Sequence, residues 1–361
     1  MSISVERVNE VLATVIDPNT GKDLASARAA RNVKVEGDRV SLDVELGYPA
    51  ASQLELIRDM VRDALLGAGA GTVDAKVTMK IVAHTVQRGL KVLPNVKNII
   101  AVSSGKGGVG KSTVAANLAL ALAAEGAKVG VLDADIYGPS QPMMLGISGK
   151  PESQDGKTME PLVNHGVQAM SIGFLVDTDQ PMVWRGPMVT QALQQLFGQT
   201  NWKDVDYLVV DMPPGTGDIQ LTLAQQVPVT GVIIVTTPQD IALIDAKKGL
   251  KMFEKVNVPI LGLVENMAVH VCSNCGHAEH IFGAGGGEKM AQEYGVDLLG
   301  SLPLDIRIRE QTDAGHPTVI AEPDGEIARS YKAIARRVAV KIAEKAKDMS
   351  LKMPTIRVLN S

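Results

Sequence analysis

A glycine-rich stretch between an apolar run and a helical run constrains the fold of this chain most. It reads Ser103-Ser104-Gly105-Lys106-Gly107-Gly108-Val109-Gly110-Lys111-Ser112-Thr113. The apolar residues 98–102 predict a buried strand before it, and residues 114–124 predict a helix after it. In this strand–loop–helix context a G-x-x-x-x-G-K-[ST] sequence forms a phosphate-binding loop. The sequence therefore predicts a nucleotide-binding α/β domain.

The residue types of this loop suit the phosphates of a nucleotide. Glycines let backbone N–H groups turn toward phosphate oxygens, and the following helix adds the positive end of its dipole. Lys111 is expected to reach the β- and γ-phosphates, and Ser112 to offer its hydroxyl to Mg²⁺. The predicted nucleotide-binding residues of the loop are Gly105, Lys106, Gly107, Gly108, Val109, Gly110, Lys111, Ser112 and Thr113.

Composition limits the class of protein. A chain of 361 residues, 45% of them hydrophobic, is longer than one average domain, so two domains are expected. The net charge is -4 and no basic run carries interleaved aromatics, so nucleic acid is not expected as an obligatory partner. No apolar leader follows Met1 and no segment is apolar enough to span a membrane, so we expect a cytoplasmic protein without a membrane partner.

The first part of the chain predicts a small α+β domain of residues 1–84. A short helix at residues 5–13 precedes two alternating runs, 33–36 and 40–44, which predict a hairpin. A helix ending near Gly67 and a further strand at residues 73–81 complete an α-β-β-α-β unit. Residues 85–96 are expected to form a linker.

Beyond the linker, strands alternate with helices over a predicted P-loop NTPase domain of residues 97–348. This alternation predicts a mostly parallel sheet covered by helices on both faces. The expected strands are 128–132, 167–172, 207–210, 229–236 and 260–265, and the expected helices include 187–197 and 240–255.

A last helix at residues 326–347 is expected to pack on this sheet, and 349–361 form a C-terminal tail. A membrane-surface helix rich in Lys and Arg is the weaker interpretation. The apolar face consists of Ile327, Tyr331, Ile334, Val338 and Ile342.

Acidic residues are predicted at strand ends near the phosphates. Asp133 and Asp135 follow one apolar strand, and Asp211 ends another. In parallel sheets the carboxyl ends of strands form the ligand-binding edge. Asp211 is therefore expected to support Mg²⁺, and the rigid turn of residues 213–218 to sense the γ-phosphate.

Four segments together resemble a known family. Residues 105–113 are similar to the deviant Walker A loop of the MinD, ParA and nitrogenase iron protein class. The runs 133–140 (DADIYGPS), 211–218 (DMPPGTGD) and 184–188 (WRGPM) narrow the resemblance to the Mrp/ApbC family of iron-sulfur cluster carrier ATPases. The resemblance covers essentially the whole second domain. At Trp184-Arg185 the sequence predicts a packed tryptophan and a surface arginine.

The resemblance implies an ATP-hydrolysing homodimer. Lys106 would reach across the dimer to the partner's nucleotide, and Lys111, Asp135 and Asp211 would complete the catalytic set. Asp135 would position the hydrolytic water, and Gly215 would offer its N–H to the γ-phosphate. Asn266 would contact adenine, with an exposed turn residue at a strand end as the alternative. Asp133 is as well explained by an indirect or solvated role as by direct participation.

The first domain resembles the iron-sulfur-assembly domain that many members of this family carry before the ATPase. It departs from that pattern, because Ala51 stands where the domain's T-x-P-x-C-P run has its cysteine. A docking role is therefore a better expectation than metal binding.

The only two cysteines of the chain, Cys272 and Cys275, lie on a loop after the strand 260–265. Two thiolates in C-x-x-C spacing suit soft metals, but a [4Fe-4S] cluster needs four cysteines. Two chains meeting face to face would supply four cysteines. This agrees with the resemblance, because members of the family bridge one labile cluster between two subunits. Zinc shared by the dimer remains an alternative, although His277 and His280 do not fit the usual spacing. A redox pair and thiols without a function are further alternatives.

Two classes of function follow. The first is a carrier that binds and hydrolyses ATP, holds a [4Fe-4S] cluster between two subunits and delivers it to apoproteins, with cluster scaffold proteins as further partners. The second is a spatial-positioning switch of the MinD/ParA kind, for which the paired thiols have no purpose. Nitrogenase-type reduction is weaker still, because the cluster cysteines of that iron protein lie far apart in sequence.

Overall fold

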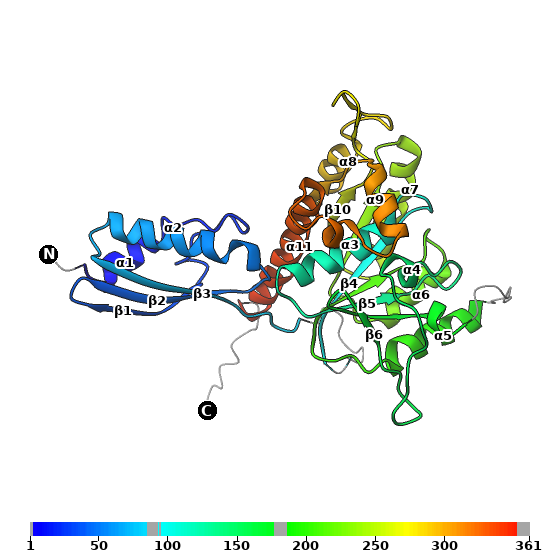
Figure 1. Ribbon diagram of the computed structural model, residues 1–361, viewed down its shortest axis with the longest axis horizontal. Coiled ribbons are helices and arrows are strands. Elements are labelled where there is room, and N and C mark those ends of the chain that lie inside the picture. Colours follow the sequence, from blue (N-terminus) through cyan, green and yellow to red (C-terminus); the bar gives the residue numbers. More distant parts are fainter. Residues whose placement is uncertain (1–2, 85–92, 94, 177–185, 352–361) are drawn as a thin grey trace, which may run out of the picture. The chain divides into compact units, whose positions relative to one another are not determined.

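The structure, a computed structural model, describes residues 3–84, 93, 95–176 and 186–351 (Figure 1). Its described residues form two compact units. The first unit joins the chain up to His84 with the last helix from Ala339 onward, and the second contains the chain between them up to Val338. None of the helices in the described ranges is both long and apolar enough to pass through a bilayer.

The first unit has the predicted α-β-β-α-β order. A three-stranded sheet has the order β1-β2-β3, in which β1 is antiparallel and β3 parallel to β2. Alternate residues of β2 are buried on one face, as a half-covered sheet requires. The elements are α1 (Val5–Leu12), β1 (Ala30–Glu36), β2 (Arg39–Leu46), the 3-10 helix η1 (Ala51–Gln53), α2 (Leu54–Gly67) and β3 (Thr72–Met79).

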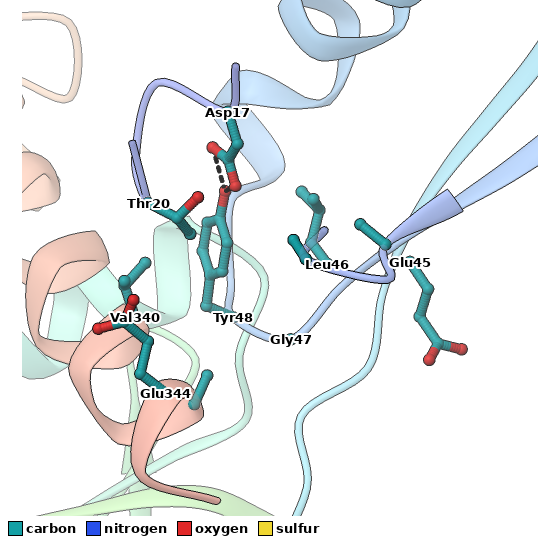
Figure 2. Close-up of a pocket in the computed structure, with 11 residues that line it drawn as sticks. Asp17, Thr20, Glu45, Leu46, Gly47, Tyr48, Val340 and Glu344 are labelled. Atoms are coloured by element: carbon teal, nitrogen blue, oxygen red, sulfur yellow. Dashed lines mark hydrogen bonds between the residues drawn. The ribbon is translucent and has the colours of Figure 1, made fainter. Parts of the chain in front are cut away.

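A small pocket lies within this first unit, beside residues 340–344 of the last helix, α11 (Glu326–Leu351) (Figure 2). The Tyr48 hydroxyl donates to the buried carboxylate of Asp17, 2.7 Å from Oδ2, at one wall of the pocket. Lys22 pairs with Glu344 of α11 at 2.7 Å. Ala51, at the position of the absent cysteine, is exposed and does not line the pocket.

The second unit is built on an eight-stranded sheet of order β13-β10-β9-β4-β8-β5-β7-β6. All neighbours are parallel except β6, which is antiparallel to β7. Every residue of β8 and β9 is buried, which shows that both faces of the sheet centre are covered. The strands are β4 (Val96–Ser104), β5 (Val129–Asp133), β6 (Leu162–Asn164), β7 (Val167–Ser171), β8 (Val205–Asp211), β9 (Gly231–Thr236), β10 (Ile260–Glu265) and β13 (Leu298–Ser301).

The helices of the second unit follow the predicted alternation. The predicted helix at 240–255 is confirmed, and the helix after the phosphate-binding loop begins at Lys111 rather than at 114. The helices are α3 (Lys111–Ala124), α4 (Gln141–Met144), the 3-10 helix η2 (Ile172–Phe174), α5 (Gly186–Gln199), α6 (Asp218–Gln226), α7 (Asp240–Lys255), α8 (Gly286–Tyr294), α9 (Ile306–Asp313), α10 (Thr318–Ala321) and α11 (Glu326–Leu351).

The last helix is shared by the two units. Its predicted apolar face is buried, and a Cβ added to Gly300 of β13 would lie 2.8 Å from Ile334, so the first part of α11 packs on the sheet edge. Ile342 is also buried, but in the first unit. The expectation that the whole helix packs on the ATPase sheet therefore needs correction, because its apolar face continues past Val338 into a different core.

Candidate nucleotide and metal-binding site

Three adjacent parallel strands bring the predicted nucleotide-site residues to one edge of the sheet. The order β4-β8-β5 places the end of β8 between the phosphate-binding loop and the end of β5. Asp133 and Asp211 are register partners, and Val102 of β4 pairs with Asp211 on the other side. The two acids and the loop therefore meet without any long connection.

Two glycines of the loop allow close approaches that a side chain would block. A Cβ on Gly105 would overlap the backbone of Asp245 and Ala246 in α7. Gly110 has a φ of +80°, and a Cβ there would overlap the side-chain amide of Asn266. The loop is therefore held between α7 and the end of β10.

Lys111 lies inside an acidic cluster. Its ammonium group pairs with Asp211, lies 3.1 Å from the Ser112 hydroxyl and 4.0 Å from Oδ2 of Asp135. Lys111 is only 6% exposed and Asp211 is fully buried. A phosphate group that binds Lys111 would replace one partner anion by another, which keeps the buried charge neutralised.

Asp133 is a buried carboxylate with four donors around it. It accepts hydrogen bonds from the backbone N–H groups of Asp135, Ser140 and Gln141 and from the Ser171 hydroxyl, at 3.0–3.2 Å. Burial, together with the neighbouring charge of Asp211, raises the pKa of Asp133 to about 7. Asp133 thus organises the loop after β5 and is not solvated.

Asp135 is less buried than Asp133 and Asp211, because 14% of its side chain is exposed. Burial raises the pKa of its carboxyl group, the charge of Lys111 opposes that rise, and the charge of Asp211 adds to it. A carboxylate with a raised pKa near phosphate-binding groups is suited to orienting or accepting a proton from water.

Gln141 is the site residue that the sequence analysis missed. Its Nε2 donates to Oδ2 of Asp211 at 2.9 Å and to the carbonyl of Ser112 at 3.0 Å. Its backbone N–H binds Asp133. A polar residue directly after the 133–140 segment was the available signal, but only the strand order shows what it contacts.

Gly215 and Asn266 both contact the phosphate-binding loop. The N–H of Gly215 donates to the Ser104 carbonyl at 2.9 Å, so a γ-phosphate would have to displace that bond. Asn266 is 6% exposed and donates to the Val109 carbonyl at 2.9 Å. The alternative of an exposed turn residue is therefore wrong for Asn266, while its contact with adenine stays a prediction.

Lys106 is half-buried, and its carbonyl accepts from the Ser104 hydroxyl at 2.9 Å. It forms no ion pair with any residue that the structure describes. The carbonyl of Thr113 accepts from Asn117 of α3. The reach of Lys106 to a partner's nucleotide remains a prediction.

The cysteines lie at the tip of a two-stranded hairpin, β11 (His270–Val271) and β12 (Ala278–Glu279), which follows β10. Gly276 has a φ of +71° and donates to the Cys272 carbonyl, which closes the turn. Cys272 is half-buried and Cys275 exposed. Backbone N–H groups, that of Cys275 first and then that of Asn274, lower the pKa of the Cys272 thiol, so they favour its thiolate.

The base of the hairpin is anchored by two histidine rings. Nδ1 of His270 lies 2.9 Å from the Leu304 carbonyl, and Nδ1 of His280 lies 2.7 Å from the Ala268 carbonyl. His277 is exposed. Within the described ranges of one chain, no group of three or more His, Cys, Asp or Glu side chains could hold a metal ion. Trp184-Arg185, most of the predicted linker and residues 352–361 of the predicted tail lie outside the described residues.

Comparisons with known proteins agree with this architecture. The family model of the NUBPL iron-transfer P-loop NTPases matches residues 95–339. The chain belongs to this family. A model of iron-sulfur cluster assembly proteins matches residues 5–79, so both NUBPL-type and assembly-type domains are present.

Relatives of this NUBPL-type chain are named as iron-sulfur cluster carrier or transfer proteins. The iron-sulfur cluster carrier protein of Escherichia coli K12 is 54% identical over 333 residues, which cover 92% of this chain and 90% of that protein. The mouse iron-sulfur cluster transfer protein NUBPL is 51% identical over 279 residues, with 76% and 86% covered. A nucleotide-binding protein of Archaeoglobus fulgidus, solved in complex with ADP, is 36% identical with a TM-score of 0.57, covering 65% of this chain and 91% of that one.

Proposed function

We propose that this NUBPL-type P-loop NTPase binds and hydrolyses ATP and carries a labile [4Fe-4S] cluster between two copies of the chain, for delivery to apoproteins. One observation carries the proposal. The segment that follows β10 holds the phosphate-binding loop through Asn266 and presents Cys272 six residues later. A single short segment thus connects the nucleotide site to a metal-binding thiol pair.

The nucleotide half of the proposal rests on the loop and its acids. Lys111 would bind the β- and γ-phosphates, and Asp135 would orient the attacking water. The hydroxyl of Ser112 and the carboxylate of Asp211 are oxygen donors of the kind that Mg²⁺ prefers, and Gln141 keeps a buried acceptor oxygen beside them, so the residues fit the ion. Bound to the nucleotide, Mg²⁺ would neutralise charge that develops on the phosphates. The ADP complex of the Archaeoglobus protein supports the binding of a nucleotide by this chain.

The cluster half rests on the hairpin. Cys272 and Cys275 supply two thiolates, and the described part of one chain gathers no larger ligand set. A [4Fe-4S] cluster takes four thiolates, so a second chain would supply the other pair. Lys106, predicted to reach a partner's nucleotide, would draw the same two chains together. The names of the Escherichia coli and mouse relatives support iron-sulfur cargo and apoprotein recipients.

The cysteine pair gives the direct test of the proposed cargo. Cys272→Ser and Cys275→Ser are each expected to retain less than a tenth of the iron and sulfide bound by the wild type after anaerobic reconstitution. ADP affinity, measured by calorimetry, is expected to stay unchanged because the hairpin lies outside the phosphate-binding loop. Ser273→Ala, between the two cysteines, is the matched control and should bind a full cluster. Iron and sulfide at wild-type levels in the cysteine variants would contradict the proposal.

A further inference from the structure

Gln141 occupies a position for which packing alone is a poor explanation. It is 1% exposed, and its Nε2 faces two acceptors, Oδ2 of Asp211 and the carbonyl of Ser112. Because both neighbours are acceptors, the amide orientation is fixed with the nitrogen toward them. Oε1 is then buried and receives no hydrogen bond from any described residue. An unpaired buried acceptor costs free energy that an apolar side chain of similar size would avoid.

The two groups that Gln141 joins are the two predicted protein contacts of the magnesium site. Ser112 comes from the start of α3 and Asp211 from the end of β8, and Gln141 is the first residue of α4. The amide occupies Oδ2 of Asp211, so Oδ1 is the oxygen that remains for Lys111 or for a ligand. Its backbone N–H is in turn held by Asp133.

We propose that Gln141 is a positioning residue of the magnesium site: it holds Asp211 by one carboxylate oxygen and ties it to the backbone of Ser112. This inference rests on the proposed binding of a magnesium nucleotide. Metal-bound water is a hydrogen-bond donor toward protein, so the unpaired Oε1 beside Asp211 is suited to accept from the water shell of the ion. No direct bond joins Asp211 to Ser112, and among the described residues the ammonium group of Lys111 is the other bridge between them.

The test compares ADP binding with and without Mg²⁺ in the full chain. Gln141→Met replaces the amide by an apolar side chain of similar length. We expect Mg²⁺ to strengthen ADP binding by the wild type. In the variant, the ratio of ADP affinity with Mg²⁺ to that without Mg²⁺ should be about tenfold smaller, while the Mg²⁺-free ADP affinity stays the same. Gln194→Met, at an exposed glutamine of α5 that binds Gln226, is the matched control and should behave as the wild type.

A second readout separates positioning from folding. Mn²⁺ bound with ADP is expected to give a different electron paramagnetic resonance spectrum in Gln141→Met, because the environment of the ion changes. The inference would be overturned if Mg²⁺ strengthened ADP binding by Gln141→Met as much as by the wild type and the Mn²⁺ spectrum of the variant matched that of the wild type. Equal loss of ADP affinity with and without Mg²⁺ would also overturn it, since that result indicates a general structural defect. If the wild type binds no ADP, the proposed function itself fails, whereas a failure confined to the variant leaves that function standing.

Discussion

At the scale of single residues, Asp133 makes the stability of the second unit depend on pH. Its pKa is raised to about 7 by burial and by Asp211, whereas an unfolded aspartate titrates near 3.8. Between these values the folded protein holds the proton more tightly than the unfolded chain does. Raising the pH from about 4 to about 7 therefore lowers stability, by roughly 2–4 kcal/mol for a shift of this size.

Asp133→Asn is expected to remove most of this pH dependence, because the amide does not ionise. Urea unfolding at pH 5 and pH 8 measures the free energy of unfolding at each pH. The fluorescence of Trp202, which is buried in the second unit, is one reporter. Asp204→Asn is the control, since Asp204 is exposed and Lys128 lowers its pKa, which places its titration below this window. The same loss of stability between pH 5 and pH 8 in Asp133→Asn and in the wild type would show that another group is responsible.

The role of a site residue could be predicted from the sequence where a motif defines it. It could not be predicted where the role depends on which strands are neighbours in the sheet. The loop residues Lys111 and Ser112 follow from spacing alone. The role of Gln141 depends on β5 and β8 being neighbours, which brings residues 70 positions apart within hydrogen-bond distance. Burial of Asn266 likewise depends on the loop of a different strand lying against it.

At the scale of elements, Gly105 controls how the phosphate-binding loop packs against α7. A methyl group there would overlap backbone atoms of Asp245 in α7, and helix backbone cannot move aside as a flexible side chain can. Gly105→Ala is therefore expected to displace the loop and to weaken ADP binding at least tenfold in a calorimetric titration. Gly198→Ala in α5 is the matched control: its Cβ meets open space, and alanine favours a helix. Wild-type ADP affinity in Gly105→Ala would refute this account of the packing.

Long elements with a clear period were predictable, and short ones were not. The predicted strands 128–132, 167–172, 207–210, 229–236 and 260–265 are confirmed, within a few residues, as β5, β7, β8, β9 and β10. The strands β6 and β13 have three and four residues, too few to show a period, and both lie at sheet edges. The hairpin β11–β12 is shorter still and is held by its turn and by two histidine rings.

At the scale of the whole molecule, α11 belongs to both units. One continuous apolar face serves two cores, and no change in its periodicity marks the boundary at Val338. The sequence therefore predicted the helix but assigned all of it to the second domain. The first unit matches the family model of iron-sulfur cluster assembly proteins but contains no cysteine. Cys272 and Cys275 of the second unit are therefore the only cysteines of the sequence.

The proposed carrier requires two whole molecules for one cluster, and mixed dimers test that claim most directly. Wild-type chains with one affinity tag are combined with Cys272→Ser/Cys275→Ser chains with another, and the tagged heterodimers are reconstituted anaerobically. Iron and sulfide are then measured per dimer. The account predicts about four iron and four sulfide in wild-type dimers and little of either in heterodimers, because a heterodimer offers only two thiolates. A full cluster on heterodimers, or zinc without sulfide in the anaerobically purified wild type, would contradict it.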